Sequence, residues 1–392
     1  MPAPYGVEQY NALADRRSLD FTVWYSQRTV PDRRWDVKEA DWRFTGVYIE
    51  DPSRGRAGAA RFAERCRAAR PDLIVCLYHE RPFVAGHPML KALGIRVVLV
   101  VEASFDAWVR RSVWKEIAKS VLFRSADAAH AGPGAVAYAR RYGFPQDRIF
   151  VVRLTTDVAH FGRALPPEGR LRLRTRLGVG GCVFLYVGRL WKPKGVLFLL
   201  EAFRQVRQRY PESSLLLVGD GVDESAIREA ARGADGIVFW PFVQRTELPA
   251  YYAAADVFVF PTLGDPHGHV VEEAHAAGLP VVATDAAGDV RNRVKDEVSG
   301  FVVPAADSAA LAERMGILAA DAALRRSMGQ QGRERVKAWG HETYVSEIER
   351  LVHGCLAAPR RATLAAGAMS ALGHLMLQAA GWTGPQVQRE FT

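Results

Sequence analysis

The sequence is poor in cysteine and lacks the signals of secretion. Its 392 residues hold four cysteines, Cys66, Cys76, Cys182 and Cys355, and no CxxC pair. Such scattered cysteines argue against a disulfide framework or a zinc site and are typical of a reducing compartment. The first fifteen residues have no apolar core of the kind found in signal peptides. We therefore expect a cytoplasmic protein.

Several ligand-binding motifs are also missing. No Gly-x-Gly-x-x-Gly follows a strand pattern, which disfavours a dinucleotide oxidoreductase, and no Asp-x-Asp is present to mark a metal-bridged diphosphate. His79 begins a zinc-protease-like pattern, but Phe83 stands where the second ligand belongs. His267, His269 and His275 lack a supporting carboxylate geometry for a metal. We expect neither a metal nor a cofactor.

Acidic residues are fewer than basic ones, 43 against 52, which gives a net charge of +9. This excess favours an anionic partner, such as a phosphorylated substrate or anionic lipid. The arginines are spread along the chain without a recognisable nucleic-acid-binding motif, so we expect no nucleic acid as partner.

Short apolar runs alternate with longer amphipathic ones, which is typical of parallel sheets with crossover helices. Strands are predicted at Phe21–Ser26, Leu73–Leu77, Val97–Val101, Ile149–Val152, Val183–Val187, Ser214–Val218, Ile237–Phe239, Val257–Phe260 and Pro280–Ala283. Helices are predicted at Val7–Arg17, Ala57–Ala69, Ala107–Phe123, Ala135–Tyr142, Val196–Arg209, Val270–Ala277, Ser308–Ala319, Ala323–Ala338 and His341–Leu356. The length favours two domains, and a break falls at Asp157–Arg170. The fold class is α/β, with doubly wound domains at 1–160 and 161–345 and a helical tail at 346–392.

The two ends of the chain are unusual. It opens with a loop, MPAPYG, and a helix, whereas a doubly wound domain normally opens with a central strand. We expect that the start is late or the chain truncated, the alternative being a domain that does without this strand. Residues 362–388 carry no formal charge and are long enough to span a bilayer, but Ser370, His374 and Gln378 disfavour insertion. A helix docked on protein is predicted; an interfacial helix after Arg360 and Arg361 is the alternative.

The first chemical constellation is Gly188-Arg189 followed by Lys194-Gly195, between a predicted strand and a predicted helix. Glycine allows close approach of the backbone to a ligand, and a helix N-terminus attracts anions. Arginine can bind two phosphate oxygens at once, and lysine adds a point charge. A solvated basic loop is the alternative. Because ligands bind at the carboxyl ends of strands in such sheets, this loop predicts phosphate binding.

The second constellation, DPHGHVVEE, places Asp265 in a loop and Glu273 inside the next helix. A carboxylate accepts hydrogen bonds from adjacent sugar hydroxyls, so both residues suit a ribose or a hexose. Gly268, His269 and Val270 would present backbone amides at the helix start. The neighbouring Glu272 is expected to be a surface residue.

Together these motifs resemble the carboxy-terminal half of family 4 retaining glycosyltransferases with the GT-B fold. The Glu-x7-Glu motif of that family is similar to DPHGHVVEEAHAAGLPVV, and its Gly-Arg-Leu…Lys-Gly signature is similar to residues 188–195. Gly219-Asp220-Gly221 resembles its Gly-x-Gly turn. The likeness covers roughly residues 130–345 well and the amino-terminal part loosely, where PAPYGVEQYNALADR resembles a first loop and helix, with Gly6 on the acceptor side.

The resemblance implies two Rossmann-like domains facing across a cleft and a retaining, metal-independent transfer of a hexose from a nucleotide sugar. Residues implied to bind the donor are Gly188, Arg189, Lys194, Gly219, Asp265, His267, Gly268, His269, Val270 and Glu273. Arg189 and Lys194 would hold the diphosphate, Glu273 the ribose, and Asp265 the transferred sugar. The motif departs from the family at Asp265, where Glu is usual, and at His267, where Phe is usual.

The amino-terminal domain departs further, since VVLVVEAS puts Glu102 where the family often has a histidine. Glu102 is predicted to orient the acceptor hydroxyl or to stabilise charge at the anomeric carbon, with a structural role as the alternative. The expected acceptor is a saccharide or a lipid-linked saccharide of a surface glycan, and basic charge suits peripheral contact with an anionic inner membrane face. The alternatives are a sugar-nucleotide epimerase of the same fold and a non-catalytic nucleotide- or glycan-binding module. The sequence leaves open a UDP-linked or GDP-linked donor.

Overall fold

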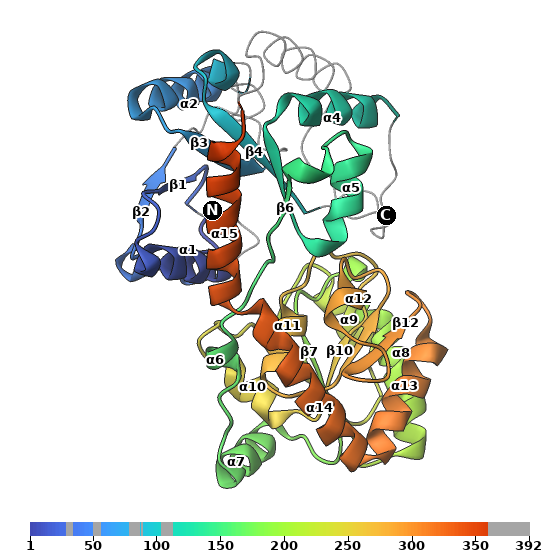
Figure 1. Cartoon of the computed structure of the whole chain (residues 1–392). Helices are drawn as coiled ribbons and strands as arrows, with labels where there is room; N and C mark the ends of the chain where they lie inside the picture. Colours follow the sequence, from blue (N-terminus) through green and yellow to red (C-terminus); the bar gives the residue numbers. More distant parts are fainter. Residues whose placement is uncertain (29–33, 50–55, 78–86, 88, 103–112, 360–392) are drawn as a thin grey trace. The chain divides into compact units, whose positions relative to one another are not determined.

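The computed structural model describes residues 1–28, 34–49, 56–77, 87, 89–102 and 113–359 (Figure 1). By its internal contacts the chain forms two units, which divide after Arg153 and again before Glu342. The first unit therefore contains the beginning of the chain and its last described helix, and the second unit is the stretch Leu154–His341. The uncharged stretch at 362–388 lies outside the described residues.

The first unit is built on a parallel sheet with the strand order β3-β4-β5-β6 and a separate parallel pair, β1-β2. Its strands are β1 (Thr22–Tyr25), β2 (Thr45–Tyr48), β3 (Leu73–Leu77), β4 (Arg96–Val101), β5 (Ala128–Ala131) and β6 (Ile149–Val151). Its helices are α1 (Pro4–Arg16), α2 (Arg56–Ala69), α4 (Val113–Ser125), α5 (Val136–Arg141) and α15 (His341–Ala357). The beginning of the helix expected at Ala107–Phe123 lies outside the described residues.

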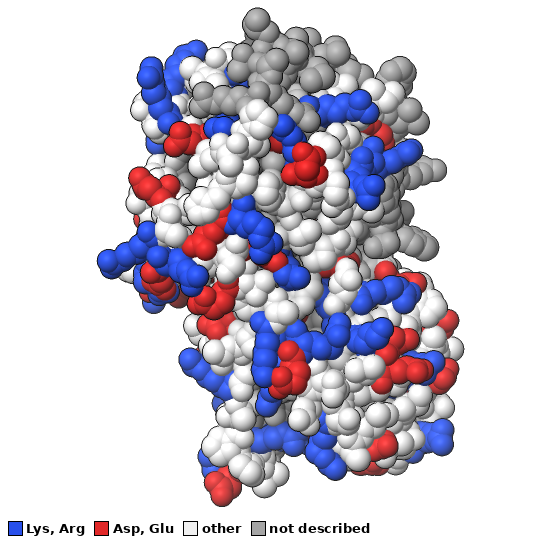
Figure 2. Space-filling model, viewed as in Figure 1, with Lys and Arg blue, Asp and Glu red and all other residues white. Residues whose placement is uncertain are grey.

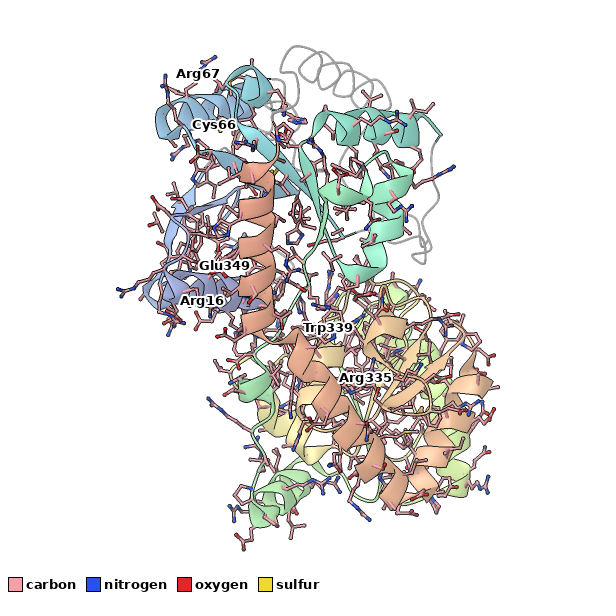
Figure 3. All side chains as sticks on the ribbon, viewed as in Figure 1. Arg16, Cys66, Arg67, Arg335, Trp339 and Glu349 are labelled. Carbon is pink, nitrogen blue, oxygen red and sulfur yellow. The ribbon has the colours of Figure 1, made fainter. Side chains whose placement is uncertain are left out.

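Helix α15 belongs to the core of the first unit. Its buried face, with Tyr344, Ile348 and Leu351, shares one apolar cluster with Leu13 of α1 and Val98 of β4. Its polar side is tied to α1, because Arg16 Nε lies 3.7 Å from Glu349 Oε1 (Figure 3). The end of the described chain is thus packed on its beginning.

The second unit has one six-stranded parallel sheet with the order β12-β11-β10-β7-β8-β9. The strands are β7 (Val183–Val187), β8 (Ser214–Val218), β9 (Ile237–Trp240), β10 (Val257–Phe260), β11 (Val281–Thr284) and β12 (Gly300–Val303). The helices are α6 (Val158–Phe161), α7 (Pro167–Leu177), α8 (Val196–Arg209), α9 (Glu224–Ala230), α10 (Leu248–Ala254), α11 (Val270–Ala276), α12 (Val290–Arg293), α13 (Ser308–Ala320) and α14 (Ala322–Val336). From β7 the chain winds first toward β9 and then, from β10, the opposite way. The topological switch point therefore lies between β7 and β10.

Apolar clusters cover both faces of this sheet. Along β7, Val183, Leu185 and Val187 enter one cluster, whereas Phe184 and Tyr186 enter the other. This alternation follows from the two-residue period of a strand, and it explains why the strand reads as an unbroken apolar run. The sheet is consequently a rigid base for the loops at its carboxyl edge.

Several elements were absent from the sequence prediction. Helix α7 occupies part of the stretch that the sequence marked as a break, and Arg170 and Arg174 anchor it through Asp256 at 2.7 and 2.6 Å. The strands β2, β5 and β12 and the helices α6, α9, α10 and α12 were also missed. Strand β5 has the sequence AAHA, which has little intrinsic strand preference, and it is a strand because it pairs with both β4 and β6.

Within the described ranges, no helix is long and apolar enough to cross a membrane. The four cysteines are free, and burial raises the pKa of the Cys66 thiol to about 12. On the face shown in Figure 2, basic and acidic side chains are interspersed.

Candidate active site

The centre of the site is a salt bridge across the switch point of the second unit. Lys194 follows β7, Asp265 follows β10, and the Lys194 Nζ donates to the Asp265 carboxylate. Burial raises the pKa of Asp265, but the charge of Lys194 and the amide of His267, at 3.0 Å from Oδ1, outweigh it and hold that pKa below its usual value. A fixed cation and a fixed anion therefore stand side by side at the position where doubly wound sheets bind ligands.

The loop that carries Lys194 is fixed by its backbone. Gly195 is the N-cap residue of α8 and has φ +70°, and a Cβ at this position would overlap the carbonyl oxygen of Pro261. Pro193 O accepts hydrogen bonds from Leu263 N at 2.8 Å and from Thr262 Oγ1 at 3.2 Å. The loops after β7 and β10 are thus hydrogen-bonded to each other, and these bonds keep Lys194 and Asp265 close together.

Gly188, Arg189 and Gly219 lie at the adjoining strand ends. Gly188 N donates to Val218 O at 3.0 Å, and Gly219, with φ +139°, packs so closely on the Gly188 carbonyl that a side chain would not fit. The guanidinium carbon of Arg189 lies 5.1 Å from the centroid of the Trp191 ring. The structure therefore brings both predicted phosphate-binding residues to one edge of the sheet.

Glu273 lies on α11 and is 3% exposed. One carboxylate oxygen accepts from Arg245 Nη1, and the other accepts from the Tyr252 hydroxyl at 2.8 Å. Arg245 Nη2 also donates to Thr156 Oγ1 at 2.8 Å. Arg245 and Tyr252 are not among the site residues predicted from the sequence, because neither lies in a local motif with Glu273.

The turn from His267 to His269 packs on a buried ion pair formed by Arg293 and Glu272. Arg293 donates to the carbonyls of His267, Gly268 and Gly288 and lies 3.2 Å from the Glu272 carboxylate. The prediction that Glu272 is a surface residue is therefore wrong, since it is 1% exposed. Helix α11 is buried on all sides, so a charged residue next to Glu273 needs an internal partner.

Gly268 itself has φ +76°, and a Cβ there would lie 2.5 Å from the ring of Phe260. The His267 ring centroid lies 4.8 Å from that of His269 and 6.0 Å from that of Trp339. Trp339 follows α14 (Figure 3). Burial, with the charge of His267, lowers the pKa of His269 to about 3, so this ring is neutral at pH 7. The predicted donor-sugar residues thus form one compact turn at the start of α11, where Val270 is the first residue.

Among the residues that the structure covers, no group of three His, Cys, Asp or Glu side chains is arranged to hold a metal ion. His275, the third histidine considered from the sequence, is buried with Nδ1 3.3 Å from Leu279 O.

In the first unit, Glu102 is exposed at the carboxyl end of β4. Burial, followed by the charge of Glu102, raises the pKa of Tyr10 to about 12. Gly6 is one turn before Tyr10 on α1, and a Cβ at Gly6 would lie 3.7 Å from the Tyr10 ring. The structure therefore places Gly6, one of the two predicted acceptor-side residues, next to Tyr10 on α1.

Residues 181–321 match the family model described as "Glycosyl transferases group 1". This part of the second unit is therefore similar to that family, in agreement with the resemblance seen in the sequence. The chain is 34% identical over 213 residues to a D-inositol 3-phosphate glycosyltransferase of Xylanimonas cellulosilytica, covering 51% of this chain and 50% of the relative. It is 33% identical over 200 residues to a GDP-mannose-dependent alpha-(1-6)-phosphatidylinositol monomannoside mannosyltransferase of Mycolicibacterium smegmatis, covering 48% of this chain and 52% of the relative. The chain thus spans about half the length of these curated relatives.

The fold of most of the chain is shared with solved structures. A glycosyltransferase from Rickettsia africae has a TM-score of 0.75 at 15% identity over 90% of this chain and 95% of that chain. Anabaena Alr3699/HepE, in complex with UDP and glucose, has a TM-score of 0.73 at 18% identity over 90% of this chain and 96% of that chain. The predicted fold class, α/β with two Rossmann-like units of the GT-B type, is confirmed.

Proposed function

We propose that this protein is a glycosyltransferase that moves a hexose from a nucleotide-diphosphate sugar to a saccharide or lipid-linked acceptor. The observation that carries the proposal is the Lys194–Asp265 pair at the switch point of a group 1 domain. A lysine held beside an aspartate provides a cation that can bind a diphosphate. The adjacent carboxylate can bind hydroxyls of the sugar attached to that diphosphate.

The roles that we propose for the site residues are those that the family resemblance implies. Arg189 and Lys194 bind the diphosphate, Glu273 binds the ribose, and Asp265 with the turn His267–His269 binds the hexose. When the bond between the anomeric carbon and the phosphate oxygen breaks, negative charge grows on the diphosphate. Fixed cations in a partly buried site stabilise that charge without reorganisation, and this is the main source of rate enhancement here.

We also propose that the reaction retains configuration and needs no metal. The acceptor oxygen attacks the face that the diphosphate leaves, its proton passes to a phosphate oxygen, and an oxocarbenium-like ion pair lies between. Support comes from the resemblance to retaining enzymes and from the two cations, which take the place of a metal in neutralising the diphosphate. Glu102 and Gly6 are proposed to lie on the acceptor side.

The donor is proposed to be UDP-linked or GDP-linked, since one relative is named for GDP-mannose and one structural neighbour holds UDP and glucose. A glycan or glycolipid acceptor is supported by relatives named for inositol phosphate, phosphatidylinositol and capsular polysaccharide. We propose a cytoplasmic protein in peripheral contact with the inner membrane face, supported by its net charge of +9.

The test is to incubate the full chain with a panel of UDP- and GDP-sugars, with and without saccharide and glycolipid acceptors, and to measure nucleotide release. A glycosyltransferase releases nucleotide much faster when an acceptor is present. Release that is equally fast without acceptor, with a changed sugar, identifies an epimerase. A protein that binds nucleotide sugar and releases nothing under any condition is a binding module, and this result would overturn the proposal.

A further inference from the structure

Arg245 lies in the loop between β9 and α10, and its side chain is 11% exposed. One nitrogen of its guanidinium donates to Glu273 and another donates to Thr156 Oγ1 at 2.8 Å. The guanidinium carbon lies 4.6 Å from the ring centroid of Phe161, which is fully buried. The guanidinium of Arg245 is thus fixed by hydrogen bonds from two of its nitrogens and by an aromatic ring that packs against it.

The neighbours of Arg245 are themselves fixed. His160 Nε2 lies 3.2 Å from the backbone carbonyl oxygen of Arg245, and His160 N donates to Asp157 at 2.8 Å. Thr156 is fully buried, and its amide donates to Trp339 O at 3.1 Å. The segment that reaches from Thr156 to Phe161 therefore forms a rigid support for the guanidinium.

We propose that Arg245 is a positioning residue that fixes the Glu273 carboxylate for the ribose hydroxyls and so makes the site selective for ribonucleotides. This inference rests on the proposed function, because it assigns Arg245 to the ribose end of the same donor site. Arg245 and Tyr252 each occupy one carboxylate oxygen of Glu273. Each oxygen has a second acceptor position, and with the rotation of the carboxylate blocked these positions point in fixed directions.

The test compares the affinity of the full chain for UDP and GDP with its affinity for their 2′,3′-dideoxy analogues, by calorimetric titration. Wild type is expected to prefer the ribonucleotide by on the order of 10- to 100-fold, the value of a hydrogen bond to a charged group. Arg245→Gln is expected to remove most of this preference by weakening ribonucleotide binding, with the dideoxy affinity changed by no more than about twofold, since only the hydrogen bond to ribose is lost.

Two further variants separate positioning from folding. Thr156→Val removes one anchor of the guanidinium while the ion pair with Glu273 stays, so the preference falls in part and the melting temperature changes little. Arg163→Gln is the matched control, because Arg163 is exposed near the same segment and has no assigned role; it should leave the preference intact. If Arg245→Gln does not fold, Thr156→Val decides the question alone.

The possible results separate the proposed role of Arg245 from the proposed function of the protein. Loss of ribonucleotide and dideoxynucleotide binding by the same factor in Arg245→Gln means that the residue is only structural, which overturns the inference. A wild-type preference that survives in both Arg245→Gln and Thr156→Val overturns it as well, while the proposed function stands. A wild type that binds neither UDP nor GDP overturns the proposed function, and the inference falls with it.

Discussion

At the scale of single residues, Lys194 is the side chain on which the proposed chemistry depends most. Its Nζ is aimed at Asp265 and reaches the switch point, whereas Lys192, two positions earlier in the same short turn, is exposed. We expect Lys194→Met to lower kcat by about 10²-fold or more, the scale of losing one preorganised stabiliser of a developing anion. Lys192→Met is the matched control and should keep kcat within about twofold, as for a surface substitution. Steady-state kinetics with the active nucleotide sugar measure both.

Glu272 gives a prediction about acid stability. Burial raises its pKa, but Arg293 and then His267 outweigh this and lower it from 4.5 to about 2. Because the folded pKa lies below the unfolded one, the stabilisation is present above about pH 4.5 and is lost as the pH falls toward 2.

Glu272→Gln should therefore destabilise the protein at pH 7 by about 3–5 kcal/mol, as expected when one partner of a buried ion pair is removed. It should also flatten the pH dependence of stability between about 4.5 and 2, as measured by urea unfolding at several pH values. Glu334→Gln breaks an exposed pair with Lys337 and should cost no more than about 1 kcal/mol. Equal losses of stability in Glu272→Gln and Glu334→Gln would contradict the stabilising role of the buried ion pair between Glu272 and Arg293.

The sequence located residues that sit in local motifs and missed those that reach the site from elsewhere. Lys194, Asp265 and Glu273 were found because each lies in a recognisable loop or helix start. Arg245 is 28 residues from its partner Glu273, and Arg293 is 21 residues from Glu272. No periodicity links such pairs, so only the folded sheet reveals them.

At the scale of elements, the site depends on turns that only glycine can make. Gly195 and Gly233 have nearly the same φ, +70° and +72°, but a Cβ at Gly195 would overlap Pro261 O, whereas a Cβ at Gly233 meets nothing within 4 Å. Gly233→Ala therefore measures backbone strain alone, about 1–2 kcal/mol.

Gly195→Ala adds a clash with backbone and should cost at least about 2 kcal/mol more, in the range of overpacked sites. It should also lower turnover, because the displaced turn carries Lys194. Urea unfolding midpoints and nucleotide-sugar turnover of the two variants provide the comparison. Similar midpoints for both variants would show that the turn adapts and does not fix the site.

Elements with strong local patterns were predicted well. The bounds of β7, α8, β8 and β10 agree with the sequence prediction, since each is an apolar run or an amphipathic stretch bounded by glycine or polar residues. Helix α7 was missed because Pro166 and Pro167 suggested a break, although proline is well accepted in the first turn of a helix. Strand β5, with the sequence AAHA, has little intrinsic strand preference, and β12 begins at a glycine, so pairing with neighbouring strands determines both.

At the scale of the whole molecule, the second unit has a complete core of its own. Its two large apolar clusters draw only on residues between Val158 and Trp339. We expect a fragment of residues 154–341 to unfold cooperatively and to bind the nucleoside diphosphate within about tenfold of the full chain's Kd, about 1.4 kcal/mol. It should transfer no sugar, because Glu102 and Gly6, the residues proposed to lie on the acceptor side, are missing. A fragment that is unfolded by circular dichroism would contradict the independence of this unit.

We propose above all that the carboxyl edge of the sheet in the second unit binds a nucleoside diphosphate through fixed cations. The most direct measurement is calorimetric titration of the full chain with UDP and GDP in the presence of EDTA, for wild type and for the double variant Arg189→Gln, Lys194→Met. We expect that wild type binds one of the two nucleotides and that the double variant loses at least about 100-fold in affinity, as for two charge-assisted contacts. Failure of wild type to bind either nucleotide, or equal binding by the double variant, would contradict it.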